Sequence, residues 1–373
     1  MKTGTRGLFI MKRLLLLSVL LIIVLVPVTV FAQETVQTVA NAEDLAALGL
    51  VPAPPAWSLG NFNHEFQGWN NCGPATITMG LSHFGYGFDQ TRAQQWLKPN
   101  IEDKNVSPWQ MVDFVNTQVA GTTRALYRAG GDLDTLRSFI ANGFPVLIEA
   151  GYDPPGNTQG WMGHYLLVVG YDDATQRITS YDSFLGPNVP YTYDEIREDW
   201  SHFNRTYIVL YDISREAQVH ALLGDDLDTT QNAINALEMA RADAIADPEN
   251  PFAWFNMGTN FVALGMYQEA AVAYDQARNV GGGLPFRMLW YQFGPFEAYN
   301  AVGRYGDTIA LARVNLDNGG EFVEETFYYG GIARQGMGET ERAISNFQAA
   351  LNFNPNFTPA RVALDELVAA TST

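Results

Sequence analysis

The sequence is poor in cysteine and in basic residues. Its 373 residues include one cysteine, Cys72, and 22 Lys and Arg stand against 40 Asp and Glu, which gives a formal net charge of −18. A single cysteine excludes an internal disulfide and a cysteine-rich zinc site. A surface this acidic repels phosphate groups, so neither nucleic acid nor an anionic membrane surface is an expected partner.

Long hydrophobic runs are also scarce, and the one that is present lies near the start of the chain. Lys12 and Arg13 precede an apolar run over residues 14–26, and residues 30–32 are of the small or apolar kind that a signal peptidase accepts. We therefore expect a signal peptide over residues 1–32 and a secreted or extracytoplasmic protein. The alternative is an uncleaved membrane anchor, because the run is nearly long enough to span a bilayer.

The rest of the sequence divides by composition into a linker and two folded parts. Hydrophobic residues make up 47% of the chain and charged residues 17%, a balance typical of folded globular proteins. Residues 33–56 are polar and rich in proline, which predicts a linker. Residues 57–213 combine helical patterns with short strand-like runs, which predicts an α+β domain. These runs cover residues 145–150, 164–171, 177–181 and 206–211.

Residues 217–373 lack strand patterns and contain an internal repeat. Gly265, Gly303 and Gly338 are spaced by 38 and 35 residues, and the same offsets relate three further positions, Tyr274, Ala312 and Phe347. A period of this length predicts stacked helical hairpins. The pattern resembles the tetratricopeptide repeat, well in the first and third copies and poorly in the middle one. It implies an all-α domain whose concave face is a candidate site for a protein partner.

The sequence around the cysteine predicts a reactive thiol. Cys72 stands directly before Gly73 and Pro74, and an apolar-periodic segment follows over residues 75–84. Proline near a first turn places Cys72 at the amino terminus of a helix. There the free backbone N–H groups and the helix dipole favour a thiolate. A lone cysteine is more often a small buried hydrophobe, so its surroundings have to decide between the two interpretations.

A cysteine nucleophile needs a base and a group that orients the base. Among the five histidines, His164 differs from the others because it begins an apolar strand-like run. The next predicted strand ends at Asp182, and an antiparallel pairing would bring this carboxylate next to the imidazole. There Asp182 can fix the imidazole tautomer. Considered alone, His164 would be interpreted as a structural histidine and Asp182 as a turn or capping residue.

Together these motifs resemble a known family. Gln67 stands five positions before Cys-Gly-Pro-Ala, and Gly-His, Gly-Tyr-Asp and Tyr-Asp-Ser follow in that order. The set resembles the papain-fold cysteine peptidases related to the bacteriocin-processing, double-glycine-leader peptidases. The resemblance implies that Cys72 is the nucleophile, His164 the base, Asp182 the orienting group and Gln67 the oxyanion-hole donor. The leader peptidases often carry an acidic residue where Asn71 stands, and they are fused to an exporter. The resemblance therefore does not imply a role in bacteriocin maturation.

The sequence thus predicts an exported cysteine peptidase or amidase with a papain-like α+β domain and tetratricopeptide-like helical repeats. Its expected partners are a protein or peptide substrate and a protein that the repeats recruit. One alternative is a non-catalytic peptide-binding or scaffold protein, and another is transfer of the acyl group to an amine. No cofactor or metal is expected, because the histidines are scattered and neither a calcium loop nor a phosphate-binding loop is present.

Overall fold

The computed structural model describes residues 42–153 and 158–371. The predicted signal peptide, residues 1–32, lies outside the described residues. Within the described ranges, no helix has both the length and the apolar character needed to cross a membrane.

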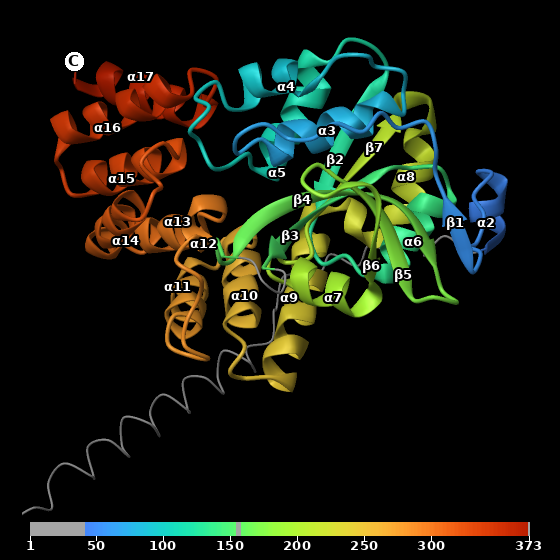
Figure 1. Ribbon diagram of the computed structural model, residues 1–373. Coiled ribbons are helices and arrows are strands. Elements are labelled where there is room, and N and C mark those ends of the chain that lie inside the picture. The colour runs from blue at the N-terminus through green and yellow to red at the C-terminus, as the bar shows by residue number, and fades with distance from the viewer. Residues whose placement is uncertain (1–41, 154–157, 372–373) are drawn as a thin grey trace, which may run out of the picture. The chain divides into compact units, whose positions relative to one another are not determined.

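Among the described residues, seven strands form one antiparallel sheet (Figure 1). The strand order is β2-β7-β3-β4-β5-β6, and β1 pairs with β4 outside this path. The four predicted strand-like runs correspond to β3, β4, β5 and β7. The strands are β1 (Ala56–Ser58), β2 (Thr123–Arg128), β3 (Val146–Tyr152), β4 (Met162–Asp172), β5 (Arg177–Asp182), β6 (Gly186–Thr192) and β7 (Tyr207–Asp212).

Helices cover both faces of the sheet. On one face α3 (Cys72–Ser82), α4 (Gln90–Leu97) and α5 (Pro108–Asp113) bury a cluster that includes Leu147 and Leu167. On the other face α6 (Leu133–Ala141), α7 (Tyr193–Ser201) and α8 (Glu216–Leu223) bury a cluster that includes Ile148 and Leu166. Alternate residues of a strand point to opposite faces, which is why β3 and β4 need apolar residues at nearly every position. Figure 1 shows α3 and α4 on one side of the strands and α7 on the other.

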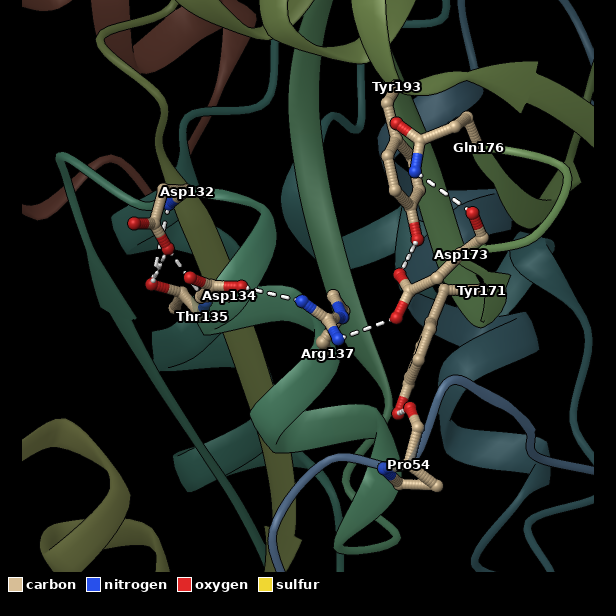
Figure 2. Close-up of polar contacts among 9 residues, drawn as sticks. All are labelled: Pro54, Asp132, Asp134, Thr135, Arg137, Tyr171, Asp173, Gln176 and Tyr193. Atoms are coloured by element: carbon tan, nitrogen blue, oxygen red, sulfur yellow. Dashed lines mark hydrogen bonds and ion pairs between the residues drawn. The ribbon is translucent and has the colours of Figure 1, made fainter.

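The described part of the predicted linker packs against the sheet. After α2 (Ala42–Ala47), Leu50 is 5% exposed and belongs to the core cluster under α6. The backbone of Val51 exchanges two hydrogen bonds with the Asn142 side chain, at 2.8 and 3.0 Å. The Tyr171 hydroxyl donates to the carbonyl of Pro54 at 2.9 Å (Figure 2). These contacts make residues 50–55 part of the folded sheet region.

The turn after β4 is fixed by polar side chains from two helices. Arg137 on α6 forms an ion pair with Asp173 at 2.6 Å, and the Tyr193 hydroxyl on α7 donates to the same carboxylate at 2.6 Å (Figure 2). Both helices begin at capping boxes, in which a side chain and a backbone N–H bond reciprocally. The turn that joins β4 to β5 is therefore held from two sides.

Residues 229–371, here called the helical region, consist of paired helices, and residues 42–227 are called the sheet region. The α8 helix, which the sequence assigned to the repeats, buries Val219 and Leu223 in the sheet region. The remaining helices are α9 (Thr229–Ala246), α10 (Pro251–Ala263), α11 (Tyr267–Ala277), α12 (Met288–Tyr291), α13 (Gly294–Ala301), α14 (Tyr305–Asp317), α15 (Glu324–Gly336), α16 (Thr340–Phe353) and α17 (Thr358–Thr371). The α+β and helical-repeat fold classes predicted from the sequence are confirmed.

Small residues opposite aromatic rings explain the repeat pattern. A side chain on Gly258 would come within 2.6 Å of the Tyr274 ring, and one on Gly331 within 2.5 Å of the Phe347 ring. Glycine is therefore needed wherever the second helix carries the ring. At the same offsets the middle copy has Phe296 on its first helix and Ala312 on its second. In the middle copy the large residue is on the first helix and the small residue on the second, the reverse of the other two copies. This exchange is why the middle copy looked atypical in sequence.

The two regions contact each other through polar and aromatic side chains. Asn204 and Asn260 exchange amide hydrogen bonds at 2.8 and 3.1 Å, and Trp109 packs on Phe357 with ring centroids 6.0 Å apart. The described residues of both regions accordingly group as one compact unit.

Three buried carboxyls also lie at this contact. Asp103 of the sheet region is hydrogen-bonded to Glu324 of α15, and Glu325 accepts from Asn105 at 3.3 Å. Asp103, Glu324 and Glu325 are each at most 3% exposed. Burial, followed by the nearby carboxylates, raises the pKa of Asp103 and of Glu325 well above the usual range.

We expect Leu50→Ala to lower the free energy of unfolding by about 2–4 kcal/mol, because it removes a buried side chain from the core. Val51→Ala is the matched control, since that side chain is 54% exposed. Its effect should stay below about 0.5 kcal/mol. Equal small effects in urea unfolding would mean that residues before β1 do not belong to the core.

Candidate active site

The predicted nucleophile stands at the start of α3. Cys72 is the first residue of this helix, and the side chain of Asn71 makes no capping hydrogen bond to it. The helix is buried from Gly73 to Leu81, whereas Cys72 is only half-buried. The thiol is thus close to uncapped N–H groups and is exposed in part.

The predicted base and orienting group are in direct contact. Leu166 of β4 stands opposite Asp182 of β5, so His164 is one alternate position away on the same face. The distance from His164 Nε2 to Asp182 Oδ1 is 2.8 Å. Because Nε2 is engaged by the carboxylate, Nδ1 is the ring nitrogen that remains for the thiol.

Asp182 is ionised although it is fully buried. Its Oδ1 accepts from the N–H groups of Phe184 at 2.7 Å and Leu185 at 3.2 Å, and its Oδ2 accepts from the Tyr191 hydroxyl at 2.6 Å. Burial alone would raise its pKa, but the hydrogen bond and charge of His164 and these donors lower it to about 2.

Cys72 and His164 stabilise each other as a charged pair. Burial opposes the thiolate, but the hydrogen bond and charge of His164 outweigh it, so the pKa of Cys72 falls below its ordinary value of 9.0. For His164 burial also opposes charge, yet the hydrogen bonds to Asp182 and Cys72 raise its pKa to about 10. Between these two pKa values the pair is a thiolate and an imidazolium.

Gln67 is held against the residue that follows Asp182. Its Oε1 accepts from the Ser183 hydroxyl at 2.8 Å, and its backbone N–H donates to the Ser183 carbonyl at 2.8 Å. With the oxygen engaged, the amide nitrogen remains as a donor. A second histidine, His64, contacts the Asp182 carbonyl through Nε2 at 2.8 Å, which the sequence did not suggest.

Lys98 is a buried cation near the thiol that sequence analysis missed. Its ammonium donates to the carbonyls of Trp69 and Asn70, at 3.4 and 3.0 Å, and to those of Ile101 and Asp103. These bonds tie down the loop that leads into α3. The charge also lowers the pKa of Cys72. A lysine at the end of a helix is typical of a solvated surface, so no sequence signal indicated this role.

Glu149 is a buried carboxyl on the same side of the sheet as α3. It stands opposite Tyr165, the residue after His164, and is 5% exposed. Burial and then the charge of Cys72 raise its pKa well above the usual range. Both effects favour the protonated form of Glu149.

The two tryptophans near the motifs lie in different surroundings. Trp69 is 67% exposed, and its indole N–H donates to Glu102 at 3.0 Å. Trp161 stacks on Phe203 with ring centroids 5.7 Å apart and an angle of 7°. In the part of the chain that the structure describes, no group of three His, Cys, Asp or Glu residues is placed to hold a metal ion.

One family model and several solved structures are similar to this chain. Residues 59–213 match the model of the Peptidase_C39 like family. This match confirms the resemblance predicted from the sequence. No curated protein matches the chain.

Three solved structures are among those similar to it. A C39-like peptidase from Bacillus anthracis is 14% identical and covers 43% of this chain and 98% of its own, with a TM-score of 0.35. Xylellain, a cysteine protease from Xylella fastidiosa, is 14% identical over 44% of this chain and 88% of its own, with a TM-score of 0.30. MamA from Desulfovibrio magneticus RS-1 is 17% identical over 38% of this chain and 77% of its own, with a TM-score of 0.33.

The charged pair predicts an unusual pH dependence of thiol reactivity. We expect iodoacetamide to alkylate Cys72 with a midpoint below pH 9.0, because the imidazolium stabilises the thiolate. In His164→Ala the midpoint should move up towards that value. His220→Ala on α8 is the control and should leave it unchanged. One shared midpoint near 9.0 in all three proteins would refute the pair.

Proposed function

We propose that this protein is a cysteine peptidase or amidase that cleaves a peptide or amide bond through Cys72, His164 and Asp182. The observation that carries the proposal is the contact chain from a thiol at a helix amino terminus to an imidazole and on to a buried, ionised carboxylate. The match of residues 59–213 to the C39-like family supports the same chemistry.

The proposed reaction is acyl transfer through a thioester. The Cys72 thiolate attacks the amide carbon and a C–S bond forms, while the carbonyl electrons move onto oxygen. The Cys72 N–H and the Gln67 amide nitrogen stabilise this oxyanion. The His164 imidazolium gives its proton to the leaving amine as the C–N bond breaks. Water then attacks the thioester and gives a proton to His164, and the C–S bond breaks, which releases the acid and restores the thiolate and the imidazolium.

Export and recruitment belong to the same proposal. The basic and apolar pattern of residues 1–32 supports a secreted or extracytoplasmic location. The helical region is proposed to recruit a protein partner or substrate, as stacked hairpins provide extended surfaces for this. A non-catalytic binding protein is the alternative, but binding alone would not need a thiol paired with a charged imidazole.

Cys72→Ala should abolish cleavage of internally quenched peptides and leave the melting temperature near that of the wild type, because the thiol has a chemical and not a structural role. The binding alternative would be favoured by a large loss of stability in Cys72→Ala. It would also be favoured if the wild type cleaves no peptide and its thiol is unreactive.

Mass analysis of the products in the presence of added amines separates hydrolysis from transfer to an amine.

Gln67→Ala should lower kcat/KM by roughly 10²- to 10³-fold, the typical loss for one oxyanion donor. Gln118→Ala is the matched control, since that side chain is exposed. Unchanged turnover in Gln67→Ala would remove this residue from the mechanism.

A further inference from the structure

The turn between β5 and β6 touches both the oxyanion donor and the group that orients the base. Ser183 in this turn contacts Gln67 twice, because its hydroxyl donates to Oε1 and its carbonyl accepts from the backbone N–H, both at 2.8 Å. The next residue, Phe184, donates its N–H to Asp182 Oδ1 at 2.7 Å, and the same oxygen lies 2.8 Å from His164 Nε2. The turn therefore borders both groups that the proposed reaction places around the scissile bond.

This turn presents apolar side chains to solvent. The Phe184 side chain is 55% exposed, and that of Leu185 is exposed as well. Phe66, which stands directly before Gln67, is a third exposed apolar residue on the segment bonded to the turn. Exposed apolar residues that occur singly need no explanation, whereas neighbouring ones mark a binding surface.

Tyr152 extends the apolar surface to the imidazole. Its ring centroid lies 6.0 Å from that of Phe184 and 5.3 Å from that of His164. The strand register explains this position, since Ala150 of β3 stands opposite His164 and Tyr152 is the next residue on the same face. Tyr152 is half-buried. An aromatic surface thus runs from the imidazole over Tyr152 to the exposed ring of Phe184.

The proposed reaction determines which part of a peptide meets this surface. The His164 imidazolium can protonate the leaving amine only if that nitrogen comes within hydrogen-bond reach of the ring. At the same time the carbonyl oxygen lies at the Gln67 side chain and the Cys72 N–H. The residue that contributes the leaving amine, the one after the scissile bond, therefore lies beside the imidazole and the aromatic surface.

The chemistry of this surface favours apolar side chains. The carboxylate beneath it is not available to a substrate, because Asp182 is fully buried and accepts from His164 and Tyr191. A large apolar side chain is removed from water when it covers aromatic rings, and this lowers its free energy. A small or acidic side chain gains little from the same contact.

We propose that Phe184 and Tyr152 form the contact surface for the residue that follows the scissile bond, and that the enzyme prefers an aromatic or large aliphatic side chain there. Phe184 is the substrate-contacting residue, and Tyr152 connects it to the imidazole. The preference for a residue after the scissile bond rests on the proposed function, since it requires a peptide bond held between Gln67 and His164.

The test begins with cleavage of a mixed peptide library by the full chain, with the products identified by mass spectrometry. In the wild type, aromatic and large aliphatic residues should be enriched directly after the cleaved bond. For one cleaved sequence, kcat/KM is then compared between peptides with phenylalanine and with glycine at that position. Phe184→Ala should lower this ratio about three- to tenfold, the effect of one aromatic contact. Phe184→Leu keeps an apolar side chain and should retain most of the preference.

Phe286→Ala is the matched control, because this phenylalanine is 54% exposed and belongs to the helical region. It should leave the ratio unchanged. An equal fall in this variant would overturn the proposal, and so would an unchanged ratio in Phe184→Ala or a wild type without the enrichment. If Phe184→Ala does not fold, Phe184→Gln keeps a long side chain without the apolar surface, and its ratio decides.

Thiol alkylation separates this inference from the proposed function and decides where the wild type cleaves no peptide. Iodoacetamide and N-benzyliodoacetamide both lose iodide to the Cys72 thiolate, so the ratio of their rates cancels a change in thiol reactivity. If the relative rate of the benzyl reagent falls about three- to tenfold in Phe184→Ala and not in Phe286→Ala, the apolar surface stands although the peptidase proposal fails. If the ratio is the same in all three proteins, the surface fails as well. A wild type that cleaves peptides without regard to the residue after the bond keeps the peptidase and overturns the surface.

Discussion

The register between β4 and β5 is the constraint on which the site depends. Pairing Leu166 with Asp182 brings the carboxylate to His164, and a slip of one residue would turn Asp182 to the opposite face. Asp182 in turn orders its surroundings, because it accepts from the backbone after β5 and from the Tyr191 hydroxyl on β6. A single buried carboxylate thus fixes the imidazole and the adjoining end of the sheet together.

The charges around Cys72 are arranged to favour one ionisation state. The imidazolium of His164 and the ammonium of Lys98 both stabilise the thiolate, while burial opposes it. Glu149 would oppose the thiolate as well if it were ionised, but burial raises its pKa and favours the protonated form. Lys98 has a second effect, since the carbonyls that it binds belong to the loop before α3. The same side chain therefore influences both the charge and the position of the nucleophile.

Local patterns in the sequence predicted the strands and the helix start that depend on neighbouring residues in the chain. Apolar runs indicated β3, β4, β5 and β7, and Cys-Gly-Pro placed Cys72 at the start of a helix. Strand β6 was missed because it carries Pro187 and Pro190 and is largely exposed. Lys98 and Glu149 could not be found, because their roles arise from contacts between segments far apart in the chain. The proline-rich segment before Trp57 looked like a linker for the same reason.

Two of the buried carboxyls between the regions, Asp103 and Glu325, link the association of the regions to protons. In the folded protein Asp103 and Glu325 hold protons at pH values where carboxyls in water have lost them. The protein with its two regions in contact therefore binds more protons than it would with the regions apart. The stability of the contact falls as the pH rises above the ordinary carboxyl range and towards the raised pKa values. Each molecule whose helical region detaches in neutral water must release these protons. A contact built for packing thereby makes acidity a factor that favours association of the two regions.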